Sequence, residues 1–290
     1  MPSWPPLTET PVGLRAGLRF GSVGTHTSRT IMLAELVDLL EAVPGRSTHE
    51  IGATGVQASL FEPTAYQPTL FPPALPKRAD YSRAILEDNV LGKDTASARR
   101  TSLQRLTELY GIDQALPIFR VLRRLWAIDE PGRPLLAMLC ALARDPLLRA
   151  TAPAVISLAP GAELLRNTLH AAIDPTPVPR FKPAILDKIA RNTASSWAQS
   201  GHLQGRVRKL RRHVTPTPAS TAFALWLGSL QGLAGDYLLN TLWAAVLDAP
   251  PNRLFESALQ AKQLGLLRAV AGGGVLEIDV AGLDPVVENR

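Results

Sequence analysis

The sequence predicts a mainly α-helical, multi-helical protein with helix-turn-helix or winged-helix elements and a short β-hairpin near its C-terminus. Apolar residues recur at intervals of three and four in most of the chain after residue 28, which is the pattern of amphipathic helices. Prolines and glycines stand where those patterns begin and end. Near the end, Gly272-Gly-Gly274 joins two segments with alternating apolar residues, which indicates a hairpin.

Length and charge restrict the class of protein further. A chain of 290 residues is long enough for two domains. Its net charge of +6 and pI of about 9.8 favour a nucleic acid or another anionic surface as partner. The only cysteine, Cys140, excludes an internal disulfide and suits a reducing compartment. The first residues lack the basic and apolar regions of a signal peptide, so we expect a cytoplasmic protein.

The chain begins with an extension, residues 1–27, followed by a first helix and a proline-rich linker over residues 28–78. Ser28 is a plausible N-cap for a helix over residues 31–43, and Pro44-Gly45 ends it. The linker repeats a short pattern, glutamine followed by two residues and Leu-Phe. It resembles the peptide with which bacterial proteins dock on the sliding clamp, although Leu-Phe pairs also pack on a chain's own core. The partner-binding candidates are Gln57, Leu60, Phe61, Gln67, Leu70 and Phe71.

Residues 79–174 are predicted to form an N-terminal helical domain. Asp80 to Gly111 has the pattern of helix, turn and helix, with a cap at Asp94 or Thr95 and a glycine stop. Arg99 and Arg100 lie on the outer side of the second helix, either as DNA contacts or as an ordinary solvated face. Further helices are expected at 115–128, 133–143, 146–158 and 162–173.

Residues 175–290 are predicted to form a C-terminal domain that contains the most basic stretch of the chain, residues 180–214. We expect a helix from Pro183, a stop at Asn192-Thr193, a short recognition helix over 194–200 and then a basic wing. Clustered charge of one sign repels itself unless a polyanion is near, which favours DNA contact over a solvated face. The predicted DNA-binding residues are Ser195, Ser196 and Gln199 at base edges, and Arg206, Arg208, Lys209, Arg211 and Arg212 at phosphates.

The last segment repeats the outline of a helix and a wing with different charge. An apolar stretch at residues 221–247 is predicted as two buried helices and not a membrane span, because Asp236 lies within it. A helix then begins at Pro251, and two strands follow. Glu277 and Asp279 would face outward on the second strand and repel phosphate. We therefore expect this element to be structural or to contact a protein.

The order of these blocks resembles the BrxA family of BREX phage-defence systems. The resemblance rests on THTSRTIMLAEL, AILEDNVLGKDTASARRTSLQRLTELYG, ARNTASSWAQSGHLQGRVRKLRR and ALQAKQLGLLRAV, and spans most of residues 25–280. It implies an all-α, DNA-binding accessory protein with winged helix-turn-helix elements that supports methylation and exclusion of phage DNA. The linker is longer than that of compact family members.

No catalytic motif accompanies these elements. The five histidines are scattered, and the sequence has no HExxH, CxxC, GxSxG, P-loop or GxGxxG. We therefore expect no catalytic residues, no cofactor and no metal. The expected partners are duplex DNA, other defence proteins and the sliding clamp, with no membrane; whether the chain forms a homo-oligomer stays open. The alternative is a helical scaffold that holds defence or replication partners without reading DNA.

Overall fold

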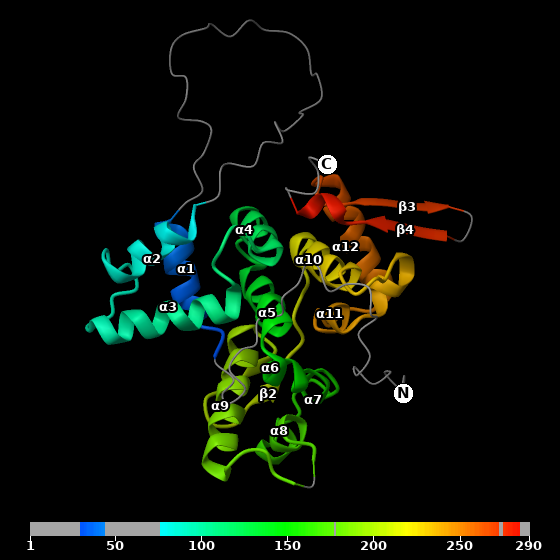
Figure 1. The fold of residues 1–290 in the computed structure, drawn as a ribbon. Coiled ribbons are helices and arrows are strands. Elements are labelled where there is room, and N and C mark those ends of the chain that lie inside the picture. The colour runs from blue at the N-terminus through cyan, green and yellow to red at the C-terminus, as the bar shows by residue number, and fades with distance from the viewer. Residues whose placement is uncertain (1–29, 44–75, 177, 273–274, 285–290) are drawn as a thin grey trace, which may run out of the picture.

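A computed structural model describes residues 30–43, 76–176, 178–272 and 275–284. Helices dominate, and the described strands form two short hairpins, so the predicted mainly-α class with a closing hairpin is confirmed. Figure 1 shows α1–α3 on one side of the central helix α5, α10–α12 with the closing hairpin on the other, and α6–α9 below. The clamp-like residues at 57–71 and the extension 1–27 lie outside the described residues.

The predicted helix-turn-helix between Asp80 and Gly111 is present. It consists of α2 (Arg78–Leu86) and α3 (Ala96–Tyr110). The Thr95 hydroxyl accepts a hydrogen bond from the Ala98 amide at 3.1 Å and caps α3, and Gly111 ends it with a left-handed φ of 62°. The preceding helix, α1 (Leu33–Ala42), packs against α2.

The centre of the molecule is built from α4 (Pro117–Ile128), α5 (Arg133–Arg144) and α10 (Pro218–Ser229). Each has proline in its first turn, where the missing amide proton costs no helical hydrogen bond. Helix α10 packs against both α4 and α5. Buried side chains from both sides of residue 174, the predicted domain boundary, therefore belong to one continuous core.

Residues 146–211 follow the order of a winged helix-turn-helix. Helices α6 (Pro146–Ala150) and α7 (Ala152–Ile156) precede an extended segment, and α8 (Arg166–Ile173) and α9 (Pro183–Gln199) follow it. The hairpin of β1 (Leu203–Gln204) and β2 (Leu210–Arg211) comes next. The extended segment hydrogen-bonds to β2, since the Leu164 amide donates to the Lys209 carbonyl at 2.8 Å and the Arg211 amide to the Ala162 carbonyl at 2.8 Å.

Helix α9 corrects one sequence prediction. The expected stop at Asn192-Thr193 does not occur, and α9 continues unbroken to Gln199. Thr193, part of the expected stop, instead donates its hydroxyl hydrogen to the Ala190 carbonyl of the same helix at 3.0 Å. The Ser196 hydroxyl likewise donates to the Asn192 carbonyl at 3.1 Å. The helix-turn-helix is thus formed by α8 and α9, not within α9.

The C-terminal part repeats the plan of helices followed by a wing. It contains η2 (Gly235–Asn240), α11 (Leu242–Ala245), α12 (Pro251–Gln263), β3 (Arg268–Gly272), β4 (Val275–Asp279) and η3 (Ala281–Leu283). The antiparallel register pairs Arg268 with Asp279 and Ala269 with Ile278. The second expected helix, Gly235 to Leu247, divides into η2 and α11. Among the described residues, no helix combines the length and apolarity needed to cross a membrane.

The ends of α1 are held by side chains from distant parts of the chain. Its N-cap, Met32, is left-handed and provides no side-chain cap. Two α9 side chains supply the acceptors instead, because the Ile31 amide donates to the Ser196 hydroxyl at 3.1 Å and the Leu33 amide to the Gln199 side-chain oxygen at 3.0 Å. At the other end, the Arg123 guanidinium donates to the carbonyls of Leu40 and Val43. A helix this short depends on such contacts.

We predict that Ser196→Ala lowers the free energy of unfolding by about 1–2 kcal/mol, because the buried Ile31 amide loses its acceptor. Urea unfolding followed by circular dichroism measures this change. Ser195→Ala is the matched control, since Ser195 is the adjacent residue on the half-exposed side of α9. Equal stability of the two variants would contradict the capping role of Ser196.

Candidate nucleic-acid interface

The loop between β1 and β2, residues 205–209, is the wing of the candidate interface. Gly205 has a φ of 105°, and a Cβ there would lie 2.1 Å from the Arg208 carbonyl oxygen, so only glycine permits this turn. Arg206 is exposed, and Val207 is 92% exposed at the loop tip. No described residue pairs with the Arg206 guanidinium, whose charge is therefore available to an external anion.

The other cations of the hairpin differ in their availability. Arg208 is exposed and pairs with Glu163 at 2.8 Å, an ion pair that solvent screens. The Lys209 ammonium donates to the Gly205 carbonyl at 2.7 Å and has no acidic partner in the described chain. Arg212 is exposed and donates to the Gln204 side-chain oxygen at 2.9 Å. Each keeps its cationic head at the surface, where it can reach a phosphate.

Arg211 is not a phosphate contact, contrary to the sequence prediction. Its side chain is 1% exposed and forms a buried ion pair with Asp248, whose other oxygen accepts the Val214 amide at 3.1 Å. The cause is the two-residue period of a strand, which turns Arg211 inward while Leu210 and Arg212 face outward. The charge count of the basic run therefore overstated the number of available cations.

Two of the predicted base-reading residues form hydrogen bonds within the fold instead. Ser196 is 0% exposed and Gln199 is half-buried, and both hold the start of α1 as described above. Ser195, which is also half-buried, lies on the outer side of α9 and accepts a hydrogen bond from the Gln199 side-chain amide at 3.3 Å. Trp197, by contrast, is fully buried, and its indole donates to the Thr151 hydroxyl at 2.8 Å.

The outer face of α9 supplies candidates that were not assigned from the sequence. Lys188 and Arg191 are exposed and precede Ser195 at helical spacing, opposite the buried Ile189 and Trp197. Among described residues neither cation has an ion-pair partner. The acid on this helix, Asp187, is engaged by His170 at 3.0 Å. Lys188, Arg191 and Ser195 fall on one face only when residues 183–199 form a single helix. The sequence prediction ended that helix at residue 192, so it did not place these residues together.

The remaining predicted cations lie elsewhere. Arg99 and Arg100 are on α3, where Arg100 is exposed and Arg99 is half-buried. The C-terminal wing agrees with expectation, because Glu277 and Asp279 are exposed on β4 while Ile278 and Val280 are buried. The two helix-and-wing units therefore differ in charge as the sequence predicts.

The Cys140 thiol and the His202 imidazole are both fully buried. Burial raises the pKa of the Cys140 thiol to about 12, so this side chain is protonated at neutral pH. Within residues 30–43, 76–176, 178–272 and 275–284, no cluster of three or more histidine, cysteine or acidic residues forms a metal site. His202 is buried between the Ser200 hydroxyl at 2.8 Å and the Val246 carbonyl at 2.7 Å, which is a structural position and not a phosphate contact.

Comparisons of this chain with protein-family models, with curated proteins and with solved structures found no match.

We predict that Arg211→Ala lowers the free energy of unfolding by about 3–5 kcal/mol, because it leaves the Asp248 carboxylate buried without its partner. Arg212→Ala, the exposed neighbour, changes it by less than about 0.5 kcal/mol. Thermal or urea unfolding of both variants measures the difference. A small effect of Arg211→Ala would show that this pair does not hold the wing.

A second prediction concerns acid stability. Burial lowers the pKa of His202 from 6.5 to about 4, so the native state resists protonation that the unfolded chain accepts. The contribution of His202 is complete above pH 6.5 and is lost as the pH falls towards 4, by about 2–3 kcal/mol over that range. Relative to wild type, His202→Gln should flatten the fall in stability between pH 7 and 4.5.

His213→Gln is the control for this measurement, because His213 is exposed. Parallel stability curves for wild type and His202→Gln over the acid range would contradict the assignment of the acid sensitivity to His202.

Proposed function

We propose that this protein binds duplex DNA through the winged helix-turn-helix of residues 146–211, without catalysing a reaction on the DNA. In this proposal α9 lies in the major groove, as the second helix of such motifs does, and the wing loop contacts the adjacent phosphates. One observation carries the proposal. The outer face of α9 and the wing present Lys188, Arg191, Arg206, Lys209 and Arg212, none with an acidic partner among the described residues.

The local distribution of charge supports a polyanionic partner. Acids near the hairpin are used by other cations, since Glu163 pairs with Arg208 and Asp248 with Arg211. The cations left over lie close together in the sequence on one helix and the hairpin that follows it. A surface of this kind gains affinity for nucleic acid from counterion release, whatever the base sequence. Ser195 supplies a hydroxyl on the same face, suited to a phosphate or a base edge.

The resemblance to the BrxA family supports a more specific role. We propose that the protein acts as an accessory factor in phage defence and brings DNA to larger protein partners. The C-terminal winged unit suits the protein-contacting part of this role, because its exposed Glu277 and Asp279 would repel phosphate. The alternative is a scaffold that holds its protein partners without contacting DNA. A DNA-binding protein shows an affinity for duplex DNA that falls with salt, whereas such a scaffold shows no salt-dependent binding of DNA.

The proposal is tested by fluorescence anisotropy with duplex DNA over a range of salt concentrations. For wild type, log K should fall linearly with log salt. The double variants Lys188→Gln/Arg191→Gln and Arg206→Gln/Lys209→Gln should each flatten the slope by roughly two units, because two phosphate contacts are lost.

Arg253→Gln/Arg268→Gln is the matched control, because it removes the same charge from exposed positions of the C-terminal unit. Equal slopes for the control and for both test variants would refute the assigned surface. No salt-dependent binding by wild type would refute DNA binding itself and favour the scaffold.

A further inference from the structure

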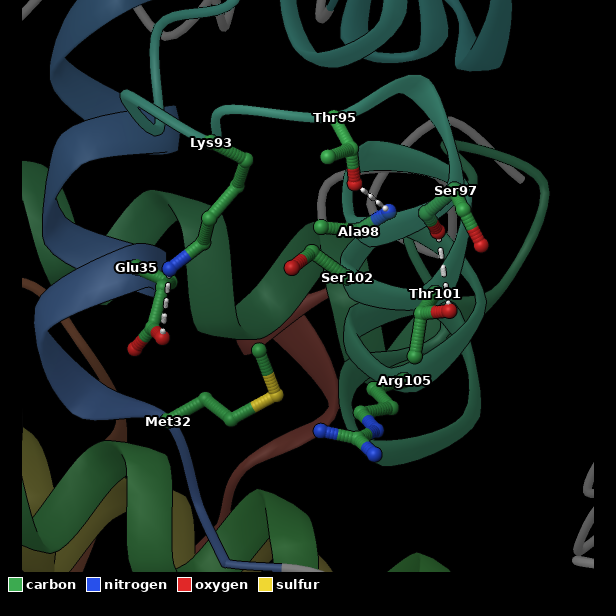
Figure 2. A pocket seen from close by; sticks show the side chains of 9 residues that line it. All are labelled: Met32, Glu35, Lys93, Thr95, Ser97, Ala98, Thr101, Ser102 and Arg105. Atoms are coloured by element: carbon green, nitrogen blue, oxygen red, sulfur yellow. Dashed lines mark hydrogen bonds and ion pairs between the residues drawn. The ribbon is translucent and has the colours of Figure 1, made fainter.

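A polar cavity lies between α1 and α3, away from the basic face of α9. Its volume is about 450 Å³, and it is open on one side. Figure 2 shows its walls: Glu35 comes from α1 and Met32 from the N-cap before it, Lys93 from the loop before α3, and Ser102 and Arg105 from α3. The volume lies within the range of small-molecule sites, roughly 300–1,000 Å³.

The charges at this cavity favour an anion. Lys93 and Glu35 neutralise each other through an ion pair of 3.3 Å between the ammonium and one carboxylate oxygen. Arg105 lines the cavity, is exposed, and has no ion-pair or hydrogen-bond partner among the described residues. The guanidinium is thus the uncompensated charge of the cavity. Its planar fork of donors matches the oxygens of a phosphate.

Ser102 places a hydroxyl at the wall of this cavity. Ser102 is only 7% exposed, yet its hydroxyl bonds to no described residue, whereas the neighbouring Thr101 hydroxyl donates to the Ser97 carbonyl at 2.9 Å. Figure 2 shows the Ser102 hydroxyl directed into the space between α3 and α1. A hydroxyl that faces an open cavity and has no protein partner is available for a hydrogen bond with a ligand atom.

We propose that this cavity binds a nucleoside monophosphate or a phosphate ester of similar size. The phosphate would lie against Arg105, with Ser102 as a further hydrogen-bonding group. The free carboxylate oxygen of Glu35 can accept from a hydroxyl or amino group of the organic part, and the Met32 side chain offers an apolar contact. The cavity is larger than a phosphate group alone requires. The proposal does not depend on DNA binding by α9.

Isothermal titration calorimetry of the full chain with AMP, GMP, CMP and UMP tests the proposal, with inorganic phosphate and adenosine as partial ligands. We expect saturable binding of at least one monophosphate, and binding at least about tenfold weaker for the corresponding nucleoside and for phosphate. Arg105→Gln should weaken that binding at least about tenfold, and Ser102→Ala about threefold.

Arg100→Gln is the matched control, because it removes an exposed arginine from the same helix outside the cavity. The double variant Lys188→Gln/Arg206→Gln should keep monophosphate binding whether or not it binds DNA, which separates this proposal from the previous one. Absence of saturable binding by wild type overturns the proposal, as does equal binding by wild type and Arg105→Gln. The proposal is also overturned if Arg105→Gln weakens the binding of duplex DNA but not of any monophosphate. That result would identify the group bound at Arg105 as a phosphate of the DNA backbone.

Discussion

The buried ion pair between Arg211 and Asp248 is the interaction on which the proposed interface depends most. It joins the second strand of the wing to the turn between α11 and α12, and Asp248 also accepts the Val214 amide. His202, just before the first strand, bonds to the Val246 carbonyl in the same turn. Both strands of a hairpin with only two residues each are thereby fixed at their base. Such a hairpin alone would be marginal in water.

Helix α9 has an inner face that holds the fold together and an outer face that we propose to contact DNA. Its inner face holds the start of α1 through Ser196 and Gln199 and contacts Thr151 through Trp197. Its outer face carries Lys188 and Arg191. The contacts of the inner face hold α1, which lies far from α9 in the sequence, next to α3. Helices α1 and α3 form the walls of the cavity proposed to bind a phosphate ester. The position of that cavity therefore depends on the α9 side chains that the sequence suggested were contacts to bases.

The helices, the helix-turn-helix at residues 78–110 and the closing hairpin could be predicted from the sequence, because apolar periodicity and turn residues are local signals. The positions of individual polar residues could not. Asn192-Thr193 resembles a helix stop, but the helix continues through it and the buried Thr193 hydroxyl bonds to the Ala190 carbonyl of the same helix. Arg211 belongs by charge to the basic run, whereas its acidic partner lies 37 residues further along the chain. Long-range pairs of this kind leave no local pattern.

We propose that the outer face of α9 and the wing contact DNA while the inner face of α9 serves the fold. Hydrogen–deuterium exchange with and without saturating duplex DNA tests it most directly, because it maps both regions in one experiment. With DNA bound, we expect added protection of residues 183–191 and 205–209 and no change at residues 275–280. Protection of residues 275–280 without any change at 183–191 and 205–209 would contradict it.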